Sequence, residues 1–212
     1  MNKKALVLLT VGGIVLLSSR KASASGKTYF DAGGFSPPDT GGGGYGTDLC
    51  DGNARRTRNM DEADESRLVP VESHGSQEYM IDTAAAALGR MVSAARRAGF
   101  SAPLFETSSG YRSRASQTAI WNRQLAKQRD MHPGWSEAQI VSEARNWVAP
   151  PGASDHETGC ATDLWLGYGI SSSNNNAIWG SAAFQWLQNN AYRFGFCNYE
   201  KEGWHWKYVG EL

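Results

Sequence analysis

The composition of the chain changes near residue 68, and this change limits how much of the chain can form a packed domain. Residues 26–67 include the Gly- and Pro-rich run FSPPDTGGGGYGTD and the charged run DGNARRTRNMDEADESR, which show little hydrophobic periodicity. Such segments cannot bury enough apolar surface to build a core. In a chain of 212 residues that is 41% hydrophobic, the sequence therefore predicts one domain over residues 68–212, preceded by a linker or wrapping arm over residues 26–67.

The N-terminal 25 residues have the features of a segment that acts at a membrane. Two lysines precede a long apolar stretch, and the small-residue run ASA at 22–24 is typical of a signal-peptide cleavage site. Arg20 and Lys21 directly follow the apolar stretch, so a short uncleaved anchor through residues 5–19 is the alternative. Residues 1–25 are thus predicted to be a signal peptide or a membrane anchor, which places the domain in the periplasm or cell envelope.

The charge balance argues against a nucleic-acid partner. Lys and Arg together number 21, Asp and Glu together number 21, and the formal net charge is +0. The chain has no cationic stripe interleaved with aromatic residues, which nucleic-acid binding would require. We therefore expect no nucleic acid among its partners.

Helical and strand-like patterns alternate along the predicted domain. Apolar spacing, capping residues and glycine stops predict four helices, over residues 77–98, 116–129, 136–148 and 182–194. Short β-like runs predict strands over residues 103–108 and 160–166, and two more around a turn in the last 18 residues, GFCNYEKEGWHWKYVGEL. Helices that interleave with short, largely C-terminal strands indicate the α+β class.

Three cysteines, Cys50, Cys160 and Cys197, leave an odd thiol if one disulfide forms in an exported protein. The sequence does not fix which pair is joined. Cys160 and Cys197 lie on neighbouring predicted strand-like segments, so a disulfide between them is one hypothesis. Because no two cysteines are close in sequence, ligation of a metal by thiolates is not expected.

The segment PPGASDHETGCATDL at 150–164 places a histidine and an aspartate around glycines. On one straight strand, His156 and Asp163 would lie on opposite faces, whereas a break near Gly159 would bring both to one site. His205, in the run EGWHW, supplies a third ligand, and two histidines with one aspartate form a suitable set for a single zinc ion. Glu202, three residues before His205, is placed to act as the base toward water.

Three segments together resemble VanY-type D-alanyl-D-alanine carboxypeptidases. These are SGYRS at 109–113, SDHETGCATD at 154–163 and EGWHWKYVG at 202–210. The wider group includes the D-alanyl-D-alanine dipeptidases, the phage L-alanyl-D-glutamate endolysins and hedgehog-like domains. The resemblance spans about residues 68–212 and implies a hedgehog/D,D-peptidase-like fold, in which helices flank a small antiparallel sheet.

The resemblance also implies roles for individual residues. His156, Asp163 and His205 would bind one zinc ion, and Glu202 would act as general acid and base. Arg112 would stabilise the oxyanion of the tetrahedral intermediate, a role that suits a permanent charge. The residues implied to contact substrate are Ser154, Gln117 and Trp206, the last as a wall of the pocket for the terminal D-alanine.

The chain departs from the family pattern beside the predicted base. Many members have proline where this chain has Gly203, and the stretch between Phe196 and Glu202 is short. A shorter loop would open the site to branched or cross-linked peptide.

Three functions follow from these features. The first is a zinc peptidase of peptidoglycan stem peptides, most simply a D-alanyl-D-alanine carboxypeptidase. The second is a peptidoglycan endopeptidase, associated with a phage or virion, and the third is a catalytically silent module that binds the cell wall. The presence of Glu202, Arg112 and all three ligands favours the enzymes over the silent module.

Overall fold

The computed structural model describes residues 61–210, which contain two antiparallel sheets. The smaller sheet is a two-stranded pair, and the larger has four strands in the order β3-β4-β6-β5, so that β4 and β6 lie at its centre. The strands are β1 (Leu68–Val71), β2 (Glu78–Ile81), β3 (Thr107–Ser109), β4 (Ala161–Leu164), β5 (Phe196–Tyr199) and β6 (Glu202–Tyr208).

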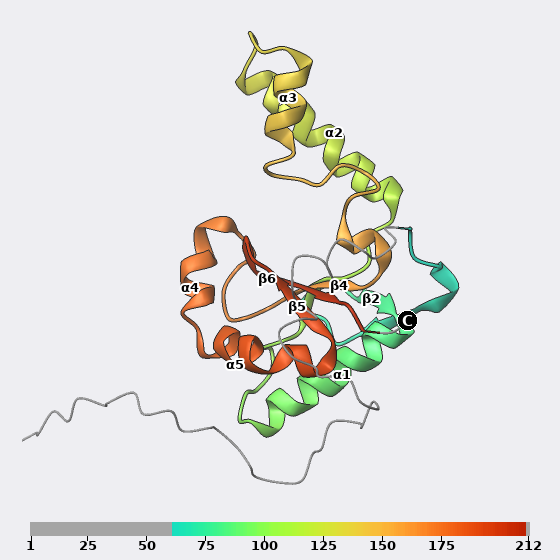
Figure 1. Cartoon of the computed structure of the whole chain (residues 1–212), viewed down its shortest axis with the longest axis vertical. Helices are drawn as coiled ribbons and strands as arrows, with labels where there is room; N and C mark the ends of the chain where they lie inside the picture. Colours follow the sequence, from blue (N-terminus) through green and yellow to red (C-terminus); the bar gives the residue numbers. More distant parts are fainter. Residues whose placement is uncertain (1–60, 211–212) are drawn as a thin grey trace, which may run out of the picture. The chain divides into compact units, whose positions relative to one another are not determined.

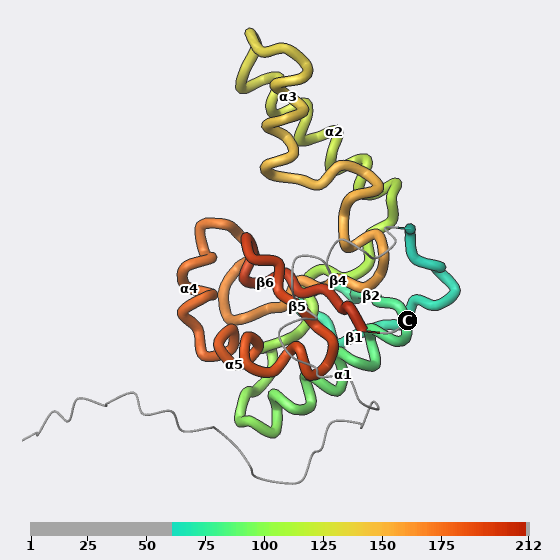
Figure 2. Tube along the Cα trace, viewed as in Figure 1, coloured from blue at the N-terminus to red at the C-terminus, as the bar shows by residue number. Residues whose placement is uncertain are grey.

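Helices flank the larger sheet, and two of them, α2 (Arg114–Met131) and α3 (Glu137–Ala144), form a hairpin that projects away from it (Figures 1 and 2). The α-helices are α1 (Asp82–Arg97), α2 (Arg114–Met131), α3 (Glu137–Ala144), α4 (Asn175–Trp179) and α5 (Ala182–Asn190). Single turns of 3₁₀-helix are η2 (Glu65–Arg67), η3 (Asp155–Thr158), η4 (Ser172–Asn174) and η5 (Ala191–Phe194). This arrangement confirms the predicted α+β class with a small antiparallel sheet flanked by helices.

The core lies between the larger sheet and the helices α1 and α5. Helix α1 contributes buried side chains at helical spacing, including Leu88 and Met91, which pack with Leu164 of β4 and Phe196 of β5 in one cluster. Burial of one such side chain is worth about 1.5–3 kcal/mol. One face of the sheet is therefore committed to the core, which leaves the opposite face for polar groups.

The predicted helix over residues 77–98 begins later than expected. Residues 78–81 form β2 and pair with β1, with Leu68 opposite Ile81 and Val71 opposite Glu78. Helical periodicity cannot reveal this pairing, because the partner strand lies outside the periodic segment and tertiary contacts override local propensity. Helix α1 then starts at Asp82 and ends where the glycine at 99 predicted.

Several other boundaries differ by a few residues from the predictions. The strand expected at 103–108 begins only at Thr107 and extends to Ser109 as β3, and the strand expected at 160–166 is shortened to β4. The capping box at Ser136 is present, but α3 ends at Ala144 rather than 148. The helix expected to reach residue 194 ends at Asn190 and continues as η5, whereas α4 was not predicted.

The hypothesis of a disulfide between Cys160 and Cys197 is wrong. Cys197 is disulfide-bonded, whereas Cys160 keeps a buried thiol. The Sγ atom of Cys160 donates to the carbonyl oxygen of Thr158 at 3.6 Å. Both cysteines lie in the large sheet or at its end, but proximity of segments does not fix the direction of a side chain.

Residues 61–67 pack onto the domain in front of the predicted boundary at 68. The amide of Ala63 donates to the carbonyl of Glu157 at 2.8 Å, and Arg67 pairs with Asp82 at the start of α1. The predicted membrane segment and most of the predicted arm lie outside the described residues. Within residues 61–210, no helix is both long enough and apolar enough to cross a bilayer.

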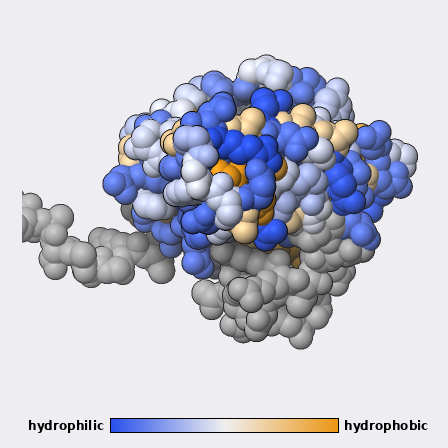
Figure 3. Space-filling model, turned by 90° about the horizontal axis from the view of Figure 1, so that it is seen from above, coloured by the Kyte–Doolittle hydropathy of each residue, from blue (hydrophilic) through white to orange (hydrophobic). Residues whose placement is uncertain are grey.

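Hydrophilic side chains dominate the described part of the face shown in Figure 3. Hydrophobic residues form only small separate areas on it. This part of the surface therefore lacks the continuous apolar area that marks a large hydrophobic interface.

Candidate metal centre and active site

Two of the predicted ligands are brought together by a sharp bend between η3 and β4. His156 lies in η3, and Asp163 lies in β4. Gly159, between them, has a φ of 67°, and a Cβ there would lie 2.8 Å from the side chain of Ile81, so both the turn and the close packing require glycine. The bend places Nε2 of His156 3.5 Å from Oδ1 of Asp163, as the predicted break at this glycine required.

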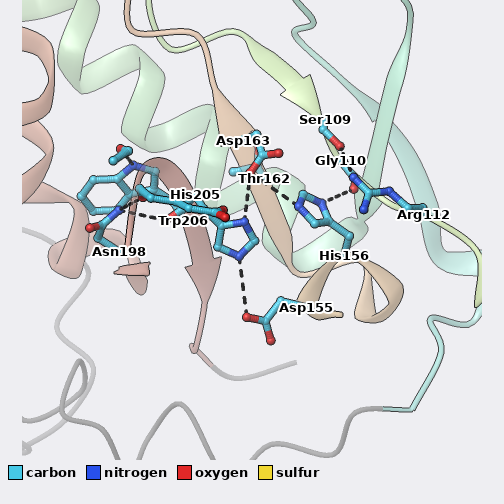
Figure 4. Close-up of polar contacts among 12 residues, drawn as sticks. Ser109, Gly110, Arg112, Asp155, His156, Thr162, Asp163, Asn198, His205 and Trp206 are labelled. Atoms are coloured by element: carbon cyan, nitrogen blue, oxygen red, sulfur yellow. Dashed lines mark hydrogen bonds and ion pairs between the residues drawn. The ribbon is translucent and has the colours of Figure 1, made fainter. Parts of the chain in front are cut away.

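The third predicted ligand lies on the adjacent central strand. His205 of β6 is directly opposite Asp163 of β4, and residues opposite one another in a sheet point to the same face. Nδ1 of His205 lies 2.9 Å from Oδ1 of Asp163. The three side chains are buried, and their candidate ligand atoms all lie within 4.8 Å of one another (Figure 4).

The donor set fits one zinc ion. Ligand bonds of about 2.1 Å to a tetrahedral ion put donor atoms about 3.4 Å apart. In the site, Oδ1 of Asp163 lies 3.5 Å from Nε2 of His156 and 2.9 Å from Nδ1 of His205. Two imidazole nitrogens and one carboxylate oxygen are typical zinc donors, and three protein ligands leave room for water or substrate. Within residues 61–210, this is the one cluster of His, Cys, Asp and Glu with such geometry.

Outer contacts fix which nitrogen of each imidazole faces the site. Nδ1 of His156 is 2.7 Å from the carbonyl oxygen of Gly110, and because a carbonyl can only accept, Nδ1 carries the proton and Nε2 remains for a metal. Nε2 of His205 lies 3.6 Å from Oδ2 of Asp155, so its Nδ1 faces Asp163. Asp155 in turn makes an ion pair with the buried Lys207.

Asp155 and Asp163 both favour a positive charge on His205, whose ring lies between them. Burial would raise the pKa of Asp163, but His156 and His205 hold it well below its ordinary value. Burial likewise opposes the charged form of His205, yet Asp155 and Asp163 raise its pKa to about 10. Asp155 remains a carboxylate because His205 and Lys207 outweigh its burial and lower its pKa to about 2. The two aspartates therefore favour a cation at this imidazole, whether a proton or a metal ion.

Glu202 lies at the start of β6, beside the three ligands. Its side chain is partly buried, and this burial raises its pKa above the ordinary value. The charges of His205, Asp163 and His156 also act on it, the aspartate raising its pKa and the histidines lowering it. A carboxyl group with a raised pKa next to a metal centre is suited to accept and return a proton.

The segment of the chain that builds this site matches a known protein family. Residues 77–211 match the family described as VanY, D-alanyl-D-alanine carboxypeptidase. The chain belongs to this family. The match covers the whole site, from the turn that precedes Arg112 to the strand that carries His205.

One relative matches this member of the VanY family over only part of its length. A D-alanyl-D-alanine carboxypeptidase of Enterococcus faecalis (strain ATCC 700802 / V583) is 35% identical over 113 residues, which is 48% of this chain and 39% of that protein. The chain thus spans less than half the length of this relative.

Two solved structures are also similar. The LdcB LD-carboxypeptidase, solved to reveal the molecular basis of peptidoglycan recognition, has a TM-score of 0.56 and 31% sequence identity, over 68% of this chain and 69% of that chain. A mutant of the vancomycin resistance D,D-pentapeptidase VanY, in complex with Zn(II), has a TM-score of 0.48 and 30% identity, over 70% of this chain and 83% of that chain.

In this member of the VanY family, Arg112 and Gln117 form a unit at the edge of the site. Nη1 of Arg112 donates to Oε1 of Gln117 at 2.9 Å, and Nη2 donates to the hydroxyl of Ser109 at 3.1 Å. The backbone amide of Arg112 donates to the carbonyl of His156 at 3.1 Å, which ties it to the ligand turn. No carboxylate within residues 61–210 makes an ion pair with Arg112.

Gln117 is implied by the VanY resemblance to contact substrate, but its side chain is nearly inaccessible. It is 1% exposed, and while Oε1 accepts from Arg112, Nε2 donates to the carbonyl of Ala149 at 2.6 Å. Both ends of the amide are therefore occupied within the protein. Gln117 is placed to orient Arg112.

The structure does not place Trp206 in the site, contrary to the prediction. Strand alternation points it away from His205, into the core, where it is 2% exposed, lies near Phe184 and donates to the carbonyl of Gly203 at 3.1 Å. Figure 4 shows its ring on the side away from Asp163. Ser154 is buried directly before η3, and its side chain makes no capping hydrogen bond to that turn.

Sequence reasoning missed Asp155 and Lys207. Asp155 adjoins His156, and Lys207 follows His205 by two residues, so alternation along β6 puts Lys207 on the same face as the ligand. The spacing of two residues between His205 and Lys207 could therefore have identified Lys207 from the sequence. The signal from Asp155 was weaker, because the 3₁₀ turn that directs it was not predicted.

The structure explains why glycine stands at 203, beside the predicted base. The amide of Gly203 donates to Oδ1 of Asn175 at 2.9 Å, a bond that proline cannot make. A Cβ at this position would also lie 2.6 Å from Cγ2 of Ile178 and 2.9 Å from Cδ1 of Trp179. Helix α4 thus packs directly on the backbone next to Glu202.

Gly203→Ala is expected to lower the free energy of unfolding by about 1–3 kcal/mol, because the added methyl group overpacks the contact with α4. Gly89→Ala is the matched control, since Gly89 lies inside α1 and a Cβ there meets nothing within 4 Å. The control should instead stabilise the protein by about 0.4–1 kcal/mol. Urea unfolding of both variants measures the difference, and equal stability would contradict the tight packing at Gly203.

Proposed function

We propose that the protein is a zinc-dependent carboxypeptidase that removes the terminal D-alanine from peptidoglycan stem peptides. The observation that carries the proposal is the convergence of His156, Asp163 and His205 beside the carboxyl group of Glu202, in a chain of the VanY family. Two histidines and one carboxylate hold zinc in other peptidases, where a nearby carboxylate serves as the base.

Each residue of the site has a distinct part in this hydrolysis. His156, Asp163 and His205 would hold a zinc ion, which would supply a Lewis acid for the water and the scissile carbonyl. Glu202 takes a proton from the attacking water and returns it to the amine of the departing D-alanine. Its raised pKa suits both transfers, because a group with a pKa nearer to neutrality can accept and then donate a proton.

Arg112 stabilises the negative charge that develops on the carbonyl oxygen during attack. Its guanidinium is oriented by Gln117 and Ser109 and is not neutralised by a carboxylate within the described residues. Such preorganised donors are most effective in a site from which water is excluded. Gln117 acts through Arg112, and we assign Ser154, directly before η3, to contact with the bound peptide.

Arg112→Met is expected to lower kcat by about 10²–10³-fold, since it removes a charged donor from the developing oxyanion. Zinc content and fold should be retained, because the guanidinium of Arg112 hydrogen-bonds to Gln117 and Ser109, which are not ligands. The control is Arg129→Met, which removes a cation of the same size from an exposed ion pair with Glu137 on the α2–α3 hairpin. If both variants kept wild-type kcat, the role proposed for Arg112 would be excluded.

The substrate implies the location. Peptidoglycan lies outside the cytoplasmic membrane, so we place the enzyme in the cell envelope, which agrees with the N-terminal features of the sequence. The peptidoglycan peptide is the partner, with no nucleic acid, and residues 5–19 would provide any attachment to the membrane.

A second candidate is an L,D-carboxypeptidase, favoured by the likeness to the LdcB LD-carboxypeptidase. The two activities share the zinc chemistry and differ in the stem bond that is cut. A stem pentapeptide ending in D-Ala-D-Ala, a stem tetrapeptide and cross-linked wall fragments distinguish them when products are identified by mass spectrometry.

Loss of one alanine from the pentapeptide supports the D,D activity, and loss of one alanine from the tetrapeptide supports the L,D activity. Cleavage confined to cross-linked fragments would show an endopeptidase. If the zinc-loaded full chain cut none of the three, the proposed function would be refuted and the wall-binding module would be favoured.

A further inference from the structure

Strand β6, which carries both Glu202 and His205, pairs irregularly with β5 in the segment between Glu202 and Trp206. Between β5 and β6, Asn198 is opposite Trp206, whereas the next residue, Tyr199, is opposite Glu202. Strand β6 therefore contains three more residues than β5 between these pairs. Such a bulge leaves backbone groups without ladder partners, and other groups must satisfy them.

The side-chain amide of Asn198 supplies two of these partners. Its Nδ2 donates to the carbonyl oxygen of Glu202 at 3.0 Å and to the carbonyl oxygen of His205 at 2.9 Å. An amide nitrogen has two hydrogens, so both are used. A single side chain thus links the backbone of the proposed base to that of a ligand.

Asn175, the first residue of α4, holds the other side of Glu202. Its Nδ2 donates to the carbonyl of Lys201 at 2.8 Å, and its Oδ1 accepts from the amide of Gly203 at 2.9 Å. The side chain is buried, with 8% exposure. The residues immediately before and after Glu202 are therefore tied to one amide.

We infer that Asn175 and Asn198 are positioning residues, which hold the backbone of Glu202 at a fixed place relative to His205 and thereby to the metal centre. This inference rests on the proposed function. We call the two side chains the asparagine clamp. Their side-chain amides hydrogen-bond to backbone atoms of Glu202, His205 and the neighbours of Glu202, so we assign them to positioning these two residues.

The bulge gives this clamp a specific purpose. In a regular strand, residues three apart point to opposite faces, so a glutamate three residues before a ligand would face away from it. The irregular pairing frees Glu202 from this alternation, and the clamp compensates for the ladder bonds that the bulge removes. A displacement of a catalytic group by about 1 Å can cost about 10²-fold in rate.

Asn175→Leu and Asn198→Leu test the clamp, since leucine has nearly the same size and no polar atoms. In the full chain, we expect kcat for alanine release from a stem peptide to fall about 10²-fold in each variant, with KM changed by less than about threefold. Zinc affinity, measured by competition with a chelating dye, should fall about tenfold for Asn198→Leu and stay within about twofold for Asn175→Leu, because only Asn198 binds the backbone of a ligand.

Asn174→Leu is the matched control. Asn174 is adjacent to Asn175 and also donates to a backbone carbonyl, that of Gly169 at 2.8 Å, which is not part of the site. Its kcat and zinc affinity should equal those of the wild type. A purely structural role would lower thermal stability without changing kcat well below the melting temperature, and that result in the clamp variants would overturn the inference.

Two further variants keep the test valid if the leucine variants do not fold. Asn175→Asp keeps the acceptor for Gly203 and loses the donor to Lys201, and Asn198→Ser keeps one donor. Each should lose less activity than its leucine counterpart is expected to lose, and wild-type kcat in both would overturn the inference. If the wild type releases no alanine, the proposed function fails, whereas the zinc affinity of the Asn198 variants still decides whether the clamp positions His205.

Discussion

Glu202→Gln is expected to lower kcat by about 10²–10⁴-fold while the protein still binds one zinc ion. Glutamine has the size of glutamate but cannot accept a proton from water and return it to the leaving amine. The three ligands and the backbone around residue 202 are unchanged by this substitution, so zinc binding and stability should remain near those of the wild type. Steady-state release of D-alanine and zinc content measure the two effects separately.

Glu200→Gln is the control for this change, because Glu200 is exposed in the turn that precedes β6. It removes the same charge two residues away and should leave kcat unchanged. An active Glu202→Gln enzyme would contradict the assignment of the base, although it would leave the zinc site and the fold intact.

Asp163→Ala is expected to weaken zinc binding by at least about 100-fold and to reduce activity in parallel when zinc is limiting. Structural zinc sites with four protein ligands contribute about 10–16 kcal/mol, or about 3 kcal/mol for each ligand, which corresponds to about 100-fold in affinity. Asp163 is also the residue that both His156 and His205 contact, so its removal affects the whole cluster.

Competition with a chelating dye measures this loss, and Asp163→Asn provides a graded comparison. Asparagine keeps one oxygen at the ligand position but lacks the charge, so its zinc affinity should lie between those of the wild type and the alanine variant. Wild-type affinity in both variants would show that the metal binds elsewhere.

Much of the site could be predicted because its residues lie in compact motifs. The spacing from His156 to Asp163 brackets a glycine, and the bend at Gly159 follows from its left-handed backbone conformation. His205 and Asp163 required a pairing of β4 with β6 that the sequence did not specify. The resemblance to the VanY family supplied this long-range information.

Other features depend on contacts between distant segments and could not be predicted from local patterns. The segment 78–81 has a helical sequence pattern, and its strand conformation depends on pairing with β1. Trp206 lies in the core because its strand packs against α5. Asn175 lies in a polar run without periodicity, and its role depends on α4 packing over Gly203. In each case, burial against another segment determines the structure.

The most direct test of the account is a titration of the metal-free full chain with zinc, during which D-alanine release from a stem pentapeptide is followed. The account predicts no release without metal, a linear rise, and a plateau at one zinc per chain, with no rise for Glu202→Gln although that variant takes up the same single ion. Full release from the metal-free chain, or a plateau only at two or more ions, would contradict the single zinc centre formed by His156, Asp163 and His205.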